Sequence, residues 1–260
     1  MKRLTILFLI FSTATAFAQD FETLFKEGVT YINQGNFAQA TASLQKAVPY
    51  ADSEGKRFNL HLNLAYSYLM TGNSGKALES YNEAIKIRGY SKELLLQRAT
   101  AFMHAGRFDE AIEDCNSILS KSPDDLDALL CKAQAVMAKG ESSKAIEEFT
   151  CIIGKYPTDL NARLGLAMAY KNEKMYEKAT LLLGLAIEEQ PDNAALYIAR
   201  SDVEREQGLL ELALLDVEKA IELSPGNAEY YTLHSILLEE CGKKSAAAKS
   251  RNKAAMLKNQ

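Results

Sequence analysis

The chain of 260 residues is long enough for one or two domains. Apolar residues make up 47% of it and charged residues 25%, which is the composition of a globular protein and excludes a disordered or fibrous chain. The 34 acidic residues outnumber the 30 basic ones and give a net charge of -4, which argues against a general nucleic-acid-binding protein.

The first 18 residues have the pattern of a secretory signal peptide. Lys2 and Arg3 supply a positive start, residues 4–11 are almost wholly apolar, and Ala16-Phe17-Ala18 matches an A-x-A cleavage site. We therefore predict a signal peptide at 1–18, cleavage after Ala18 and a periplasmic or secreted mature protein. An uncleaved anchor or a buried N-terminal helix is the alternative, and the apolar stretch is well short of the roughly 20 residues that span a bilayer. No later apolar run is long enough to span a membrane.

From residue 21 onwards the sequence repeats every 34 residues. Three residue types keep this interval in a fixed register. They are Pro123, Pro157, Pro191 and Pro225; Ala77, Ala111, Ala145, Ala179, Ala213 and Ala247; and Gly72, Gly106, Gly140, Gly208 and Gly242, with Lys174 in the one vacant glycine position. We divide residues 19–260 into seven repeats, at about 21–57, 58–91, 92–125, 126–159, 160–193, 194–227 and 228–260. The first repeat contains three extra residues around Ala51 to Arg57.

Each repeat is predicted to form two short helices. In the fourth, Leu130, Ala133 and Met137 recur at helical steps, Gly140 interrupts, and a second amphipathic stretch runs until Pro157. Glycine is suited to the tight turn between the helices, and proline ends the second helix. A small alanine lets the two helix backbones approach closely.

These residues resemble the tetratricopeptide repeat family. The second repeat shows the family's order of small, aromatic and glycine positions in Leu64, Ala65, Tyr68, Gly72, Ala77, Tyr81 and Ala84. The resemblance implies an all-α fold, a right-handed superhelical solenoid of about seven antiparallel helix-turn-helix units, and a protein or peptide as partner. We expect the last repeat to cap the solenoid, because Arg251 replaces a large apolar residue there and lysines surround it. A basic patch for an anionic partner is the other interpretation of this cap.

No catalytic or metal-binding motif stands out, and we expect no cofactor, no metal and no enzymatic activity. His61, His104 and His234 are far apart in the sequence and are expected on helix surfaces or half-buried. The four cysteines, Cys115, Cys131, Cys151 and Cys241, form no C-x-x-C pair. A disulfide is compatible with export, but Cys115 and Cys151 occupy second-helix positions that are usually packed, which favours buried free thiols. Glu141-Ser142 and Glu79-Ser80 match the catalytic dipeptide of cell-wall lytic transglycosylases, a remote alternative.

In the family, the first helix of each pair lines a concave groove that holds a peptide or a helix. The resemblance assigns this role to Leu62, Asn63, Tyr66, Met70, Leu96, Gln97, Thr100, Met103, Leu130, Cys131, Gln134, Met137, Leu164, Met168, Lys171 and Ile198, and farther along to Asp202 and Arg205. Their apolar, methionine-bearing character favours an apolar peptide or an amphipathic helix, since methionine adapts to varied shapes. The alternative is that half of these leucines and methionines fill the core between repeats.

The sequence therefore predicts an exported, non-catalytic scaffold or adaptor that binds a protein or peptide. A self-associating structural component of an envelope assembly is the alternative function. Helical repeats that read RNA are disfavoured by the acidic charge and by export.

Overall fold

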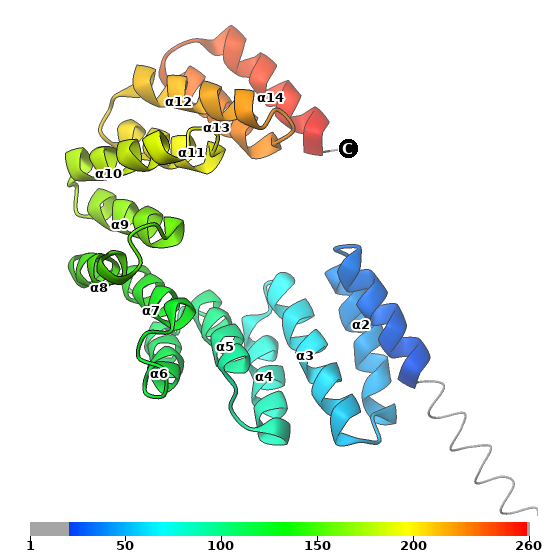
Figure 1. Cartoon of the computed structure of the whole chain (residues 1–260). Coiled ribbons are helices and arrows are strands. Elements are labelled where there is room, and N and C mark those ends of the chain that lie inside the picture. Colours follow the sequence, from blue (N-terminus) through cyan, green and yellow to red (C-terminus); the bar gives the residue numbers. More distant parts are fainter. Residues whose placement is uncertain (1–20, 259–260) are drawn as a thin grey trace, which may run out of the picture. The chain divides into compact units, whose positions relative to one another are not determined.

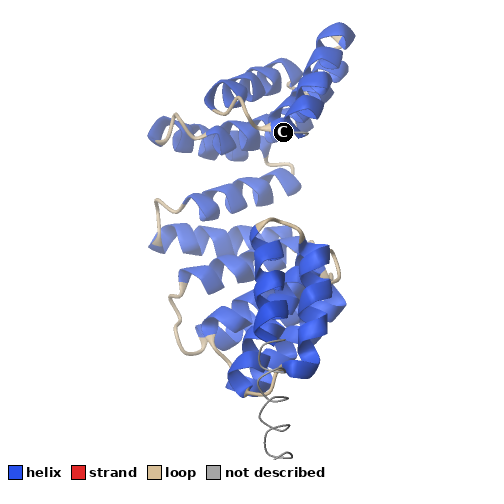
Figure 2. Ribbon diagram, turned by 90° about the vertical axis from the view of Figure 1, so that its right-hand side faces the viewer, coloured by secondary structure: helices blue, strands red, loops and turns tan. Residues whose placement is uncertain are grey.

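The computed structural model describes residues 21–258, and the predicted signal peptide lies outside the described residues. Within residues 21–258 the chain forms helices and short connections and contains no strand (Figures 1 and 2). The helices lie at residues 21–33, α2 Phe37–Ala47, α3 Glu54–Met70, α4 Ser74–Arg88, α5 Lys92–His104, α6 Phe108–Leu119, α7 Leu126–Ala138, α8 Ser142–Lys155, α9 Leu160–Asn172, α10 Tyr176–Glu189, α11 Ala194–Glu206, α12 Leu210–Leu223, α13 Ala228–Glu240 and α14 Lys244–Lys258, with a 3-10 helix η1 at Val48–Tyr50.

Within residues 21–258 the chain divides into two compact units, which we call the N-terminal unit (up to Ala135) and the C-terminal unit (from Val136). In the N-terminal unit each helix packs on the next along the chain, as α2 on α3, α3 on α4, α4 on α5 and α5 on α6. The same succession runs from α8 to α14 in the C-terminal unit, where α9 also contacts α11. This succession confirms the all-α repeat solenoid, because a helix pair buries both faces only by stacking on its neighbours.

The turn between the two helices of a repeat adopts a left-handed backbone at one residue. Six glycines at this position have φ between 70° and 90°, a conformation that costs glycine nothing; they are Gly35, Gly72, Gly106, Gly140, Gly208 and Gly242. Lys174, which fills the vacant position, has the same backbone with φ of 58° and is the single non-glycine residue of the described chain with positive φ. The fold therefore imposes the turn geometry even where the sequence does not favour it.

The first helices begin at side-chain caps. Ser91 accepts a hydrogen bond from the Leu94 N–H at 3.2 Å, and Asp159 accepts one from the Ala162 N–H at 2.8 Å. Such caps satisfy N–H groups that have no partner within the helix. The prolines follow the second helices, and Pro157 lies two residues beyond the end of α8 at Lys155. The stop signals thus agree with the predicted pattern.

The repeated alanines lie where the paired helices cross. All six members of the series, Ala77, Ala111, Ala145, Ala179, Ala213 and Ala247, are 0% exposed. Large side chains such as Leu44, Tyr81, Leu183 and Val217 are buried around them in the cores of the two units. The prediction of close helix approach at alanine is confirmed.

The extra residues of the first repeat change one helix boundary. They form the connection that follows η1 and the first turn of α3, which begins at Glu54 and not near residue 58. Ser53 caps this start by accepting from the Lys56 N–H at 3.3 Å. At 17 residues α3 is the longest of the helices α2 to α14, so the insertion is absorbed mainly as helix.

Candidate functional site

The predicted groove residues of the N-terminal unit lie on α3, α5 and α7. Tyr66 and Met70 on α3 are 42% and 49% exposed, which is high for side chains of their size. Leu62, Leu96 and Met103 are half-buried and pack against the core of this unit. The face thus combines two strongly exposed apolar side chains with others that also support the core, so both interpretations of these residues hold in part.

Leu130 and Cys131 on α7 do not offer surface to a partner. Each is only 8% exposed, and Cys131 belongs to the core cluster of the N-terminal unit. Their assignment to the accessible groove is therefore corrected, because the stacking of α7 on the preceding repeat covers them. Gln134 on the same helix is exposed.

Two polar side chains of this face form hydrogen bonds with backbone carbonyls of their own helices. The Asn63 amide donates to the Asn59 carbonyl at 2.8 Å, and the Thr100 hydroxyl donates to the Leu96 carbonyl at 3.0 Å. The Tyr66 ring stands edge-on to Phe37 with centroids 5.7 Å apart and an interplanar angle of 83°. That contact orients the aromatic ring while 42% of the tyrosine stays exposed.

The matching positions of the C-terminal unit carry ion pairs. The Lys171 ammonium on α9 pairs with the Asp202 carboxylate on α11, and the Arg205 guanidinium on α11 pairs with Glu240 at the end of α13. The second pair includes an Nε–Oε2 hydrogen bond of 2.9 Å. Met168 is 45% exposed, whereas Met137, Leu164 and Ile198 are half-buried. Neighbouring first helices in this unit are thus joined by charges, and Lys171 is engaged within the chain.

A second set of polar pairs joins the two helices within a repeat. Arg98 donates from Nε and Nη2 to both carboxylate oxygens of Asp114, at 2.8 and 2.6 Å, and Arg200 bonds Asp216 in the same way at 2.7 Å for both bonds. Both pairs span 16 residues and lie at equivalent positions three repeats apart. The aspartates are buried and the arginines are half-buried. The sequence analysis missed these pairs, although Arg and Asp recur in it at this spacing.

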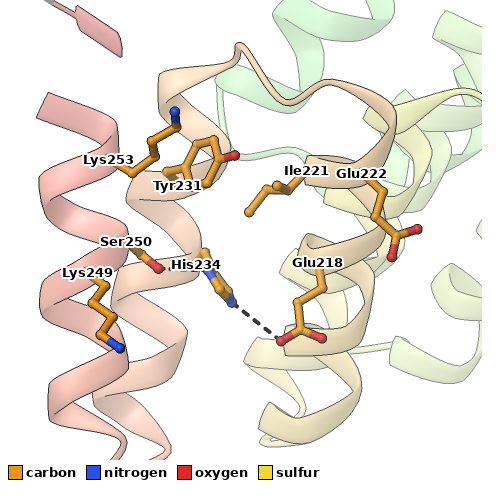
Figure 3. Close-up of a pocket in the computed structure, with 8 residues that line it drawn as sticks. All are labelled: Glu218, Ile221, Glu222, Tyr231, His234, Lys249, Ser250 and Lys253. Carbon is orange, nitrogen blue, oxygen red and sulfur yellow. Dashed lines mark hydrogen bonds and ion pairs between the residues drawn. The ribbon is translucent and has the colours of Figure 1, made fainter. Parts of the chain in front are cut away.

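A cavity of about 500 Å³ lies between α12, α13 and α14 (Figure 3). His234 Nδ1 lies 3.0 Å from the Ser250 hydroxyl, and His234 Nε2 lies 3.5 Å from a Glu218 oxygen. This order of serine, histidine and carboxylate is also found in acyl-transfer triads. However, His234 and Ser250 occupy the positions of Arg98–Asp114 and Arg200–Asp216, again 16 residues apart. The contact is therefore the last repeat's version of a helix-pairing bond.

The histidines and cysteines named in the sequence analysis differ in their burial. His61 is half-buried, and burial lowers its pKa, while His104 is exposed, as the sequence predicted. Cys115 is buried as expected, but Cys151 is exposed, because it faces outward from α8. The expectation of a packed Cys151 is wrong. Among residues 21–258, no three or more His, Cys, Asp or Glu side chains are grouped so as to hold a metal ion.

The outward side of the C-terminal unit carries exposed leucines that the sequence analysis did not single out. Leu181 and Leu185 on α10 are 66% and 51% exposed, and Leu212 and Leu215 on α12 are 48% and 60% exposed. Leu181 and Leu215 are 34 residues apart, at a position where the earlier repeats have Glu79, Glu113 and Glu147. A change from glutamate to leucine at one repeat position was the missed signal.

The last repeat presents its charges to solvent. The Arg251 side chain is 60% exposed and pairs with Glu239, and the lysines of this repeat are exposed: Lys243, Lys244, Lys249, Lys253 and Lys258. Positive charges near the carboxyl end of a helix also interact favourably with the helix dipole. The prediction that Arg251 turns a core position towards water is confirmed.

Comparisons with known proteins agree with this architecture. Family models described as tetratricopeptide repeat match residues 25–92 and 92–135. A solved tetratricopeptide repeat protein from Parabacteroides merdae is 25% identical, with a TM-score of 0.71 over 92% of this chain and 93% of that chain. The chain belongs to the tetratricopeptide repeat family. Its C-terminal repeats lie outside the two matched segments, so there the membership rests on the 34-residue register and on the fold.

Two further solved structures share the fold. A thermophilic tetratricopeptide repeat protein of Thermus thermophilus is 20% identical, with a TM-score of 0.59 over 72% of this chain and 99% of that chain. The C-terminal part of a repeat-containing protein from Cytophaga hutchinsonii is 20% identical, with a TM-score of 0.56 over 90% and 92% of the two chains. No curated protein sequence matches the chain. Between residues 21 and 258, none of the helices has the length and apolar character that a membrane span requires.

Proposed function

We propose that this tetratricopeptide repeat protein is a non-catalytic adaptor that binds an apolar peptide or an amphipathic helix on the first-helix face of its N-terminal unit. Tetratricopeptide repeats generally mediate protein–protein interactions, and the family is typically non-catalytic. The observation that carries the proposal is the contrast between the two units. Tyr66 and Met70 are exposed and apolar on α3, whereas the equivalent helices of the C-terminal unit are joined by Lys171–Asp202 and Arg205–Glu240.

Exposed tyrosine and methionine are suited to such a partner. Tyrosine supplies a large contact area with few rotatable bonds, and methionine repacks around different shapes. Burying these side chains gives affinity with little dependence on salt, because screening acts on charges and not on apolar contact.

The test uses the mature chain as bait in an envelope fraction, with recovered proteins identified by mass spectrometry. Replacement of Tyr66 and Met70 by alanine should remove at least one reproducibly enriched protein, and 0.5 M salt should not. Lys249→Glu with Lys253→Glu is the matched control, because it alters two exposed residues of the last repeat. Retention of every partner by the Tyr66/Met70 variant, with loss in the lysine variant, would move the site to the last repeat.

The transglycosylase alternative is disfavoured by the charge state of Glu141. Lys139 and Lys144 lie 3.0 and 3.3 Å from its carboxylate oxygens, and their hydrogen bonds lower the pKa of Glu141. A glycosidase general acid needs a raised pKa to hold its proton at neutral pH. Glu141 instead lies in the turn between α7 and α8, and Ser142 is the first residue of α8.

Export is part of the proposal and rests on the sequence of residues 1–18. Ala18→Asp should block processing, because signal peptidase requires a small residue at that position. N-terminal sequencing of the mature protein should start at Gln19. Recovery of folded protein that retains Met1 would refute export by this route.

Self-association is the second candidate function, and the exposed leucines of α10 and α12 favour it. Large exposed apolar patches commonly mark interaction sites. Leu181→Glu with Leu215→Glu restores the glutamate that three earlier repeats have at this position. Light scattering after size exclusion should show a larger assembly for the unaltered chain and a monomer for this variant, whereas a monomer in both cases would eliminate self-association.

A further inference from the structure

Two cysteines from different repeats meet in the core of the N-terminal unit. Cys115 lies on α6 and is 0% exposed, while Cys131 lies on α7 and is 8% exposed. Both belong to one hydrophobic cluster, and their thiols are hydrogen-bonded to each other. The two thiols are therefore neighbours within one buried core.

The pair also departs from the repeat pattern at both positions. Cys115 stands where other repeats have the large side chains Tyr81, Phe149 and Leu183, and Cys131 stands where they have Asn63, Gln97 and Gly165. The repeat fold is thus built without cysteine at either position in the other repeats. Residues that the fold does not demand, placed in contact across two helices, call for a separate explanation.

We propose that Cys115 and Cys131 form an oxidisable pair that closes into a disulfide and links α6 covalently to α7. A disulfide needs Cα atoms roughly 4.4–6.8 Å apart and side chains that point at one another. Contact between the thiols provides the second condition, and helices packed in successive positions of the same core are compatible with the first. Cys151 and Cys241 remain outside the pair, since one is exposed and the other is half-buried.

The contact makes the two thiols unequal. The hydrogen bond between the thiols lowers the pKa of Cys131, whereas the same bond and burial raise the pKa of Cys115. Cys131 is also the more exposed of the two. Because the thiolate is the nucleophile in disulfide exchange, Cys131 is the residue that reacts first.

The oxidant is an external disulfide, represented most simply by oxidised glutathione. The Cys131 thiolate attacks one glutathione sulfur, the glutathione S–S bond breaks, and one glutathione leaves and takes up a proton. Cys115 then loses its proton and its sulfur attacks Sγ of Cys131, which breaks the mixed disulfide and releases the second glutathione. The two cysteines together lose two electrons and two protons, and two glutathione thiols form.

Closure would stabilise the repeat junction around α6 and α7. A cross-link between residues that are close in sequence restricts the unfolded chain, and a loop of about 15 residues gives a substantial effect. The pair would thus strengthen one junction of the solenoid in an oxidising compartment and leave it unlinked under reducing conditions.

The experiment uses the mature chain with Cys151→Ser and Cys241→Ser, which removes the other thiols and leaves the core pair unchanged. After incubation with oxidised glutathione under native conditions, the chain should lose two hydrogens in mass, and peptide mapping should find Cys115 joined to Cys131. The unfolding temperature should rise by on the order of 5–10 °C and fall back after dithiothreitol.

Two results would overturn the proposal. In one, both thiols remain open to alkylation after oxidant treatment and subsequent unfolding. In the other, the reaction stops at a glutathione adduct on Cys131. Cys115→Ala in the same background identifies that adduct, since Cys131 then has no partner with which to form an internal link.

Discussion

Glu204 provides the sharpest test of how the repeats are packed. It lies near the end of α11 and is 8% exposed, at a position where the other repeats have Tyr68, Phe102, Val136, Tyr170 and Leu238. One of its carboxylate oxygens is buried without a hydrogen-bond partner. Arg200 lies 4.0 Å from the other oxygen, but its guanidinium is bound to Asp216. Glu204 is thus a carboxylate in an apolar position.

Burial, followed by repulsion from Asp216, raises the pKa of Glu204 from 4.5 to about 7, against the attraction of Arg200. The folded chain therefore holds a proton that the unfolded chain releases at lower pH. Stability from this group is fully present below pH 4.5 and is lost as the pH rises through 7. The loss is on the order of 2–3 kcal/mol between pH 5 and pH 8, because this window covers most of the interval between the two pKa values.

Glu204→Leu should remove this loss, because leucine is the residue of the next repeat at the same position. Urea unfolding at pH 5 and pH 8 should show the variant gaining roughly 2–3 kcal/mol of stability relative to the unaltered chain between the two pH values. Glu206→Leu, an exposed change on the same helix, is the control and should leave the pH profile unaltered. An advantage of Glu204→Leu that is equal at both pH values would refute the reasoning.

Four further changes, in two matched pairs, test local geometry, each by thermal or urea unfolding. Gly165→Ala should destabilise by about 1–3 kcal/mol, because the new Cβ would lie 2.3 Å from the buried Phe149 ring. Gly154→Ala, whose new Cβ would have no atom within 4 Å, should stabilise by about 0.5–1 kcal/mol through helix propensity alone. A change in unfolding free energy of the same sign for both glycine variants would contradict this packing. Lys174→Gly should stabilise by about 1 kcal/mol by relieving the left-handed backbone, whereas Glu147→Gly, an exposed change within α8, should cost about as much.

The fold could be predicted because its determinants recur at fixed positions. A turn glycine, a crossing alanine and a closing proline each serve a local purpose, and repetition every 34 residues separates them from chance. The binding face was harder to predict, because exposure depends on how one repeat covers the next. Leu130 and Tyr66 look equally suited to a groove in the sequence, yet one is 8% exposed and the other 42%.

Polar partners were the least predictable feature for a related reason. Lys171 and Asp202 are 31 residues apart and lie on helices that meet only after α10 has been stacked beside them. Pairs within a repeat are easier to recognise in the sequence, because the two partners are separated by the same number of residues in each repeat that has them. Comparison of each position along the repeats would have found Arg98–Asp114 and Arg200–Asp216 together.

That comparison also shows why departures from the repeat pattern are informative in a solenoid. The stability of each repeat depends on itself and its neighbours, so a local cost at one repeat is not spread over the chain. Glu204 therefore weakens α11 and α12, while the core built around Tyr81 is expected to be unaffected. Hydrogen exchange at pH 8 should show faster opening of these two helices than at pH 5 after correction for the intrinsic rate. If every repeat opened faster by the same factor, the chain would be unfolding as one cooperative body, and a departure at a single position could not be assigned a local role.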